Sequence, residues 1–154
     1  MTRLLDNHLA GRWQSGSGAG TPLFDPVLGT ELVRVSGAGL DLAEGFAFAR
    51  TRGGAALRAL TYAERSAQLA RIAEVLQGQR DAYYDIALQN SGTTRNDSAV
   101  DIDGAIYTLS QYAKWGAQLG VARWVAEGKL VKLGKEGRFQ SGHIRESKRG
   151  LGLF

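Results

Sequence analysis

Residues 61–120 carry a helical hydrophobic period that most constrains the fold of this chain. Thr61 and Glu64 have the spacing of a capping box, in which the threonine oxygen accepts the amide proton three residues on and the glutamate reaches back to the threonine amide. Apolar residues at the i, i+3, i+4 and i+7 offsets of one helix face follow: Leu69, Ile72, Ala73 and Leu76. The pattern predicts a helix that starts after Thr61 and buries this face.

One or two further helices are predicted within the same stretch. Gly78 interrupts the first helix. The period then resumes at Tyr83, Ile86, Ala87 and Asn90. It stops at Gly92, a residue suited to the left-handed position beyond a helix end. We expect the next helix to begin at Asn96 or Asp97 and to end after Lys114, so that acidic and basic residues complement its dipole.

The first 60 residues predict short strands followed by a helix. Residues 7–14 alternate in part, residues 15–20 are glycine and serine turn material, and residues 31–36 alternate like a half-buried strand. A helix face with Leu42 and Phe46 is expected to end at Gly53 and Gly54. The glycine string is not a dinucleotide fingerprint, because a proline-containing segment follows it where that motif requires a helix.

The carboxyl-terminal residues predict a basic β hairpin. Residues 129–133 and 138–144 read as strands separated by a turn at 134–137. Residues 123–149 hold eight Lys or Arg against three Glu, a net +5 within a chain total of +4. Scattered basic residues without stacking aromatics favour a solvated hairpin over a nucleic-acid site. Because an apolar strand-like run, residues 150–154, is an unusual place for a domain to stop, we expect truncation there.

Composition excludes several classes of site. The chain has no cysteine, which excludes disulfides, cysteine zinc sites and a thiol nucleophile within these 154 residues. His8 and His143 lack an acidic partner at ligand spacing, so no metal site is predicted. Asp101 and Asp103 are two residues apart on a helix and point in different directions, so helix-dipole complementation explains them better than a catalytic dyad. No signal peptide or membrane span is recognisable, which favours a cytoplasmic protein without a membrane partner.

Several short motifs together resemble the amino-terminal part of an aldehyde dehydrogenase, and the resemblance covers essentially the whole chain. The motifs are Gly11-Arg12-Trp13, Asp25-Pro26-Val27-Leu28-Gly29, the helix start at Glu64-Arg65, Asn90-Ser91-Gly92-Thr93 and Tyr112-Ala113-Lys114-Trp115. Residues 53–61 and 94–104 are similar to the branch of the family that acts on CoA-linked semialdehydes in the degradation of aromatic compounds such as benzoate.

The resemblance implies an α/β fold cut off at the start of the cofactor-domain sheet. Residues 1–122 would form strands and helices, residues 123–149 an oligomerisation β arm, and residues 150–154 the first strand of the cofactor domain. Relatives use a cysteine nucleophile, a glutamate, an asparagine and NAD or NADP. Those groups would lie beyond Phe154, so we assign no catalytic, cofactor-binding or metal residue, and we expect the chain alone to be inactive. An intact relative would be a homo-oligomer that acts on a CoA-linked semialdehyde.

The resemblance also implies a substrate tunnel along the third helix. Val100, Gly104 and Tyr107, together with Gln111, share one face of that helix. A glycine inside a helix costs about 1 kcal/mol relative to alanine, so Gly104 needs a reason. One reason is close packing against a neighbouring element, and the other is a wider entrance for a CoA-bearing substrate. A different kind of function also stays open, a noncatalytic module that pairs with a full-length dehydrogenase.

Overall fold

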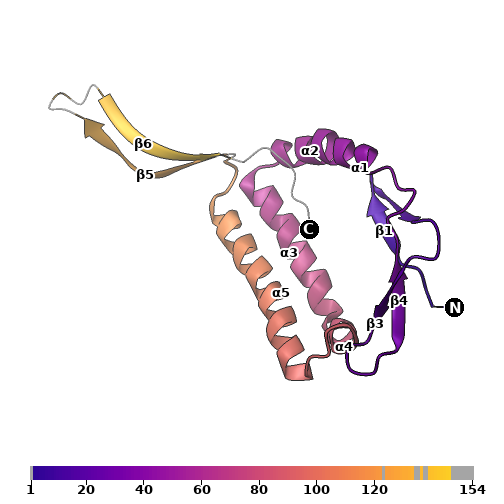
Figure 1. Cartoon of the computed structure of the whole chain (residues 1–154). Helices are drawn as coiled ribbons and strands as arrows, with labels where there is room; N and C mark the ends of the chain where they lie inside the picture. Colours follow the sequence, from indigo (N-terminus) through magenta and orange to yellow (C-terminus); the bar gives the residue numbers. More distant parts are fainter. Residues whose placement is uncertain (1, 123, 134–135, 137–138, 147–154) are drawn as a thin grey trace.

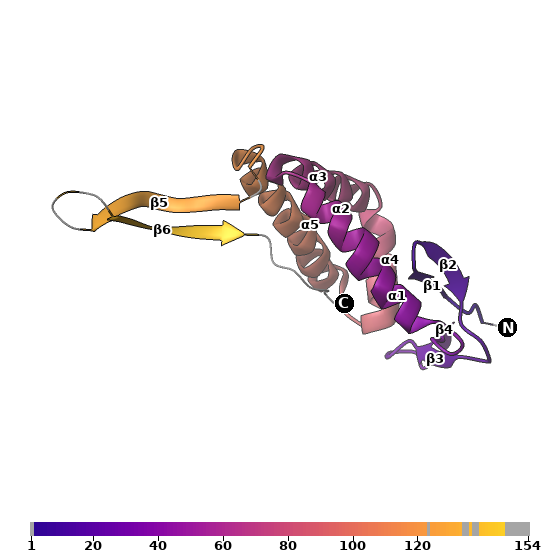
Figure 2. The same ribbon diagram turned by 90° about the horizontal axis from the view of Figure 1, so that it is seen from above.

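The computed structural model describes residues 2–122, 124–133, 136 and 139–146. Within those residues the strands form three two-stranded antiparallel sheets, two before the helices and one after them. Figure 1 shows the helices in the middle of the molecule, with β1, β3 and β4 on one side and the last hairpin projecting on the other. The same order of parts is visible from above in Figure 2.

The first hairpin pairs β1 (Asp6–Leu9) with β2 (Arg12–Ser15). Ala10 and Gly11 connect the strands with φ values of 50° and 80°. Two consecutive left-handed residues make the tight turn that matches the twist of a two-residue hairpin. The predicted two-stranded beginning is therefore confirmed.

The second hairpin pairs β3 (Thr21–Phe24) with β4 (Glu31–Val35). Residues 31–36 were predicted as a strand, but β3 was not predicted. Pro22 is accommodated because its partner Arg34 makes its backbone hydrogen bonds on the other side, donating to the Arg3 carbonyl at 2.9 Å and accepting from the Leu5 amide at 2.8 Å, so no amide is needed at Pro22. The connecting turn is held by the Asp25 carboxylate, which accepts hydrogen bonds from the Val27 and Leu28 amides at 2.8 and 2.9 Å.

A continuous helical segment follows β4. It consists of α1 (Leu42–Phe48), a π-helical turn (Ala49–Gly53) and α2 (Gly54–Ala59). The predicted helix end at Gly53 and Gly54 is wrong, because both glycines adopt right-handed helical φ values of −61° and −63°. Glycine permits a break there but does not impose one, and the helix ends only where Leu60 becomes extended.

The longest helices are α3 (Tyr62–Gly78) and α5 (Arg95–Gln118), which lie side by side, with the shorter α4 (Arg80–Ser91) at one end of the pair (Figure 1). The predicted start of α3 is confirmed, since the Thr61 side chain accepts from the Glu64 amide and Glu64 reaches back to the Thr61 amide at 2.7 Å. Two or three helices were predicted in this stretch, and three are present.

The predicted end of α4 is confirmed, whereas the predicted start of α5 is wrong. Gly92 has the expected left-handed φ of 64° and ends α4. The start of α5 is earlier than predicted, because Thr94 caps it and forms a second capping box with Asp97. Asp97 is thus the third residue of the helix and not its first.

The core at the helix interfaces is small. Its buried apolar residues among those described are Ala73, Tyr84, Ile106 and Ala113. Ala73 confirms part of the predicted α3 face, but Ile72 is 48% exposed, so its assignment to the core is wrong. Among the described elements α3 packs mainly against α5, and one helix covers a narrower stripe than the i, i+3, i+4, i+7 pattern suggests.

The last hairpin pairs β5 (Trp124–Leu133) with β6 (Phe139–Glu146) and confirms the prediction, with longer strands than expected. The segment before β5 is fixed to the start of α3, since the Tyr62 amide donates to the Ala122 carbonyl at 3.0 Å and the Ala63 amide to the Gly120 carbonyl at 2.8 Å. Residues 150–154, predicted as the first strand of the next sheet, lie outside the described residues. The role of residues 123–149 as an oligomerisation arm stays a prediction.

The chain exposes more surface than a compact protein of its size. Its accessible area is 11719 Å². A folded monomer of 16.5 kDa is expected to expose about 7,600 Å². Part of the exposed area lies on the helices, where Val75, Ile86 and Trp115 are 45%, 60% and 57% exposed. Large parts of the helix faces are therefore open.

Candidate functional site

The predicted tunnel residues lie on the outward face of α5. Val100 is 73% exposed and Tyr107 is 64% exposed. Gly104 lies between them, and Gln111 extends the same face half-buried. The opposite face of α5 carries the buried Ile106, which packs toward α3. The structure thus places Val100, Gly104 and Tyr107 on one open face of α5.

None of the described residues packs closely against Gly104. A Cβ atom built there would have none of their heavy atoms within 4 Å. Gly116, further along the same helix, is the opposite case, because a Cβ there would lie 2.0 Å from the Ser66 hydroxyl oxygen. Close packing of α3 against α5 explains the glycine at position 116, a role that the sequence analysis did not predict. Gly104 has no such packing role among the described residues.

A polar network fixes α5 against α4 beside Gly104. The Tyr84 hydroxyl donates to an Asp103 carboxylate oxygen at 2.7 Å, and the Arg80 guanidinium lies 3.7 Å from the same oxygen. Asp103 was predicted only to complement the helix dipole, and this interpretation was incomplete. Burial raises the pKa of Tyr84, and the hydrogen bond to Asp103 raises this pKa further. The network holds the neighbouring turn of α5 in one position.

Arg95 completes this contact between the two helices. Its guanidinium lies 5.0 Å from the centre of the Tyr84 ring, and it also pairs with Asp81 at 2.9 Å and Asp85 at 3.6 Å. A cation over a tyrosine face is attracted to the ring quadrupole. The sequence signal for this cluster is the spacing of aspartates one helical turn apart on α4, opposite an arginine in the first turn of α5.

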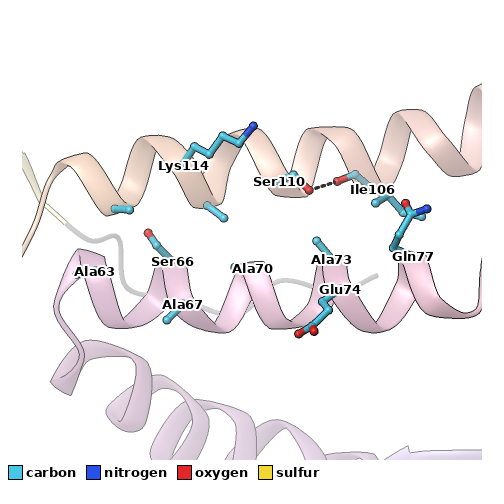
Figure 3. Close-up of a pocket in the computed structure, with 12 residues that line it drawn as sticks. Ala63, Ser66, Ala67, Ala70, Ala73, Glu74, Gln77, Ile106, Ser110 and Lys114 are labelled. Atoms are coloured by element: carbon cyan, nitrogen blue, oxygen red, sulfur yellow. Dashed lines mark hydrogen bonds between the residues drawn. The ribbon is translucent and has the colours of Figure 1, made fainter.

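A second open feature is a groove along the α3–α5 pair, with a volume of about 590 Å³. Figure 3 shows the two helices side by side, with Ser66 and Ala73 pointing from α3 toward α5. Alanine dominates the lining, at positions 63, 67, 70 and 73 of α3 and positions 113 and 117 of α5. Lys114 and Glu74 also line it, one from each helix. The sequence reasoning did not anticipate this groove.

The glycine-rich residues 16–20 do not have the setting of a phosphate-binding loop. The glycine-rich residues 16–20 lie between β2 and β3, and the space beside Gly16 is filled, since a Cβ there would lie 2.1 Å from the Ser36 carbonyl oxygen. A phosphate-binding loop instead leads into a helix. Within the described part of the chain, no three His, Cys, Asp or Glu residues gather closely enough to hold a metal ion.

No helix in the described residues combines the length and the apolar character that a bilayer span requires.

Comparison with known proteins settles the family. Residues 13–133 match the aldehyde dehydrogenase family, which is well over half of the chain. The chain belongs to the aldehyde dehydrogenase family. Over 150 residues, or 97% of the chain, it is 50% identical to the 3,4-dehydroadipyl-CoA semialdehyde dehydrogenase of Aromatoleum evansii. The resemblance predicted from the motifs is therefore confirmed.

The aldehyde dehydrogenase fold is confirmed as well. The structure resembles a crystal structure of an NAD-dependent benzaldehyde dehydrogenase from Corynebacterium glutamicum with a TM-score of 0.65 and 21% sequence identity, covering 80% of this chain and 27% of that one. The chain spans 29% of the length of its Aromatoleum relative. It therefore represents under a third of an aldehyde dehydrogenase of that size.

Proposed function

We propose that this chain is the part of an NAD- or NADP-dependent aldehyde dehydrogenase that precedes the catalytic residues, in an enzyme that oxidises a CoA-linked semialdehyde to the acid. The observation that carries the proposal is the 50% identity over 150 residues to a relative named as a CoA-semialdehyde dehydrogenase. The proposed setting is cytoplasmic degradation of aromatic compounds such as benzoate, by a homo-oligomer.

In this proposal the chain lines part of the path by which the substrate reaches the catalytic residues, and it supplies no catalytic residue itself. The chain has no cysteine, so the thiol that family members use is not among these residues. The glycine-rich residues 16–20 lie between two strands, which is not the setting of a phosphate-binding loop. We therefore expect the isolated chain to show no aldehyde-dependent formation of NADH or NADPH and no saturable binding of either dinucleotide in calorimetry.

The proposed contribution is the open face of α5. Val100 and Tyr107 flank Gly104, where no side chain narrows the surface and where an added Cβ would have no described heavy atom within 4 Å. The Tyr84–Asp103 hydrogen bond holds the adjacent residue, so the face is presented in a fixed orientation. A path for a long CoA-bearing substrate needs such room along a rigid wall.

The test uses a hybrid in which this chain replaces the matching part of the Aromatoleum relative. Gly104→Met fills the face, whereas Gly104→Ala restores helix propensity and adds only a methyl group. We expect Gly104→Met to raise KM for the CoA-linked semialdehyde at least about tenfold more than for a short free aldehyde. The Gly104→Ala control should change neither KM by more than about threefold.

Equal KM changes for both substrates in Gly104→Met would contradict the proposed substrate path. A second candidate function is a noncatalytic module that pairs with a full-length dehydrogenase. The observation that favours it is the large open surface of the chain. It predicts that the isolated chain binds an intact family member, measurable by co-purification at defined concentrations of both proteins.

A further inference from the structure

The turn of α5 around Gly104 is weak for a helix interior. Glycine has more backbone freedom to lose on folding than any other residue, so it holds a helical turn less firmly than alanine does. The Thr108 hydroxyl also donates to the Gly104 carbonyl at 2.8 Å, and a hydroxyl bond of this kind often bends a helix. A Cβ atom built at Gly104 would have no described heavy atom within 4 Å. The turn therefore depends on neighbouring residues to keep one position.

The tether of this turn comes from α4, through the residue that precedes Gly104. The Tyr84 hydroxyl donates to an Asp103 carboxylate oxygen at 2.7 Å. A hydrogen bond to a charged acceptor is about twice as strong as one between neutral groups. Tyr84 is 4% exposed, whereas the Asp103 side chain is 45% exposed. The donor is therefore the better held of the two, and Asp103 takes its position from Tyr84.

The Tyr84 ring is itself held by two guanidinium groups. The Arg80 guanidinium carbon lies 5.6 Å from the ring centre and that of Arg95 lies 5.0 Å from it. Each arginine is also paired with a carboxylate, Arg80 with Asp103 at 3.7 Å and Arg95 with Asp81 at 2.9 Å. Cations over an aromatic ring are attracted to its quadrupole. A side chain fixed in this way can hold a second residue in a precise place.

We infer that Tyr84 is a positioning residue for the proposed substrate path, which acts through Asp103 to fix the Gly104 turn and thereby favours a CoA-linked semialdehyde over a short free aldehyde. A long substrate that runs along the open face of α5 loses binding when this turn moves, since small misplacements of a positioning element have large effects. A short aldehyde does not extend along that face. This inference rests on the proposed function.

The experiment uses the hybrid in which this chain replaces the matching part of the Aromatoleum relative. Tyr84→Phe removes the hydroxyl and keeps the ring between the two arginines. Tyr83→Phe is the matched control, because it removes the same atom from the neighbouring residue, whose hydroxyl donates to Gln79 at 3.3 Å and not to α5. Thermal unfolding of every hybrid sets an assay temperature at which all are folded. KM and kcat are then measured with a CoA-linked semialdehyde and with a short free aldehyde.

We expect Tyr84→Phe to raise KM for the CoA-linked semialdehyde about tenfold, and KM for the free aldehyde by less than about threefold. The kcat for each substrate should stay within about twofold, because the catalytic residues are unchanged. Tyr83→Phe should change no value by more than about twofold. Adding Gly104→Ala to Tyr84→Phe should return KM for the CoA-linked semialdehyde to within about threefold of the unsubstituted hybrid, because alanine stiffens the turn that has lost its tether.

Three results would overturn the inference: equal KM changes for Tyr84→Phe and Tyr83→Phe, a parallel rise of KM for both substrates in Tyr84→Phe, or no restoration by Gly104→Ala. In each of these cases a selective effect of Gly104→Met would leave the proposed substrate path in place. If Gly104→Met itself shows no selectivity, the substrate path is wrong and the inference fails with it.

Discussion

Replacing Gly116 with alanine tests the helix crossing that organises the structure. A Cβ at this position would lie 2.0 Å from the Ser66 hydroxyl oxygen and 3.4 Å from the Ser66 Cβ. Non-bonded contacts of a Cβ atom with another heavy atom are not shorter than about 3 Å. The Ser66 hydroxyl, which donates to the Tyr62 carbonyl at 2.7 Å, would have to rotate away, or the helices would have to separate.

The size of the effect follows from three contributions. Loss of the hydrogen bond from buried Ser66 costs about 1 kcal/mol. Overpacking costs about 1–3 kcal/mol, and alanine gains about 1 kcal/mol over glycine inside a helix. Gly116→Ala should therefore lower the free energy of unfolding by about 1–3 kcal/mol. Gly104→Ala, in the same helix with open space, should raise it by up to about 1 kcal/mol.

A double-mutant cycle assigns the effect to the Ser66 hydroxyl. In a Ser66→Ala background the close contact is removed, and the Cβ of residue 66 at 3.4 Å and the Tyr62 carbonyl oxygen at 3.8 Å remain at ordinary van der Waals separations. Gly116→Ala should then be neutral or stabilising, with a coupling energy of about 2 kcal/mol. Urea unfolding followed by circular dichroism at several protein concentrations measures these values, with the m-value as a check on two-state behaviour. Equal effects of Gly116→Ala and Gly104→Ala, or an undiminished cost in the Ser66→Ala background, would refute the proposed crossing.

Three further predictions concern the turn, the polar network and association. Asp25→Ala should lower the free energy of unfolding by about 1–3 kcal/mol, because the Val27 and Leu28 amides lose their acceptor. Asp25→Asn should lower it by less. Equal losses for the two variants in urea unfolding would contradict this role of Asp25. Because the pKa of Tyr84 is raised above 10.0 in the folded chain, the unfolded chain loses this proton first, so stability should fall as pH rises through and beyond 10. Absorbance titration at alkaline pH should show one late-ionising tyrosine that Tyr84→Phe removes, and an unchanged titration curve in the variant would exclude this assignment. Light scattering of the isolated chain should show concentration-dependent association through its open apolar faces, whereas a monodisperse monomer with a sharp, reversible thermal transition would count against it.

Local signals predicted the elements of this fold well, because each depends on only a few neighbouring residues. The Thr61–Glu64 spacing predicted a helix start, and Gly92 predicted a helix end, since caps use residues within one turn. The same reasoning missed Thr94, because Asn96 and Asp97 compete with it as plausible caps in sequence. Pro22 is unfavourable in a strand interior, and only the structure shows that its partner Arg34 forms its backbone hydrogen bonds with Arg3 and Leu5 instead, which permits β3.

Features that depend on which elements meet could not be predicted from the sequence. The contrast between Gly104 and Gly116 depends on where α3 crosses α5, and nothing in the local sequence distinguishes the two glycines. The hydrogen bond from Tyr84 to Asp103 joins residues 19 positions apart, so the aspartate was interpreted only through its own helix. The outward face with Val100, Gly104 and Tyr107 was predictable, because helical spacing alone places these residues together.

The most direct test of the central claim is substrate preference in the hybrid of this chain with the remaining portion of the Aromatoleum relative. Formation of NADH and of NADPH is measured with a CoA-linked semialdehyde and with a short free aldehyde, each at several concentrations. We predict that kcat/KM for the CoA-linked semialdehyde exceeds that for the free aldehyde by about tenfold or more. A folded hybrid that oxidises the free aldehyde equally well, or that oxidises neither substrate, would contradict the claim.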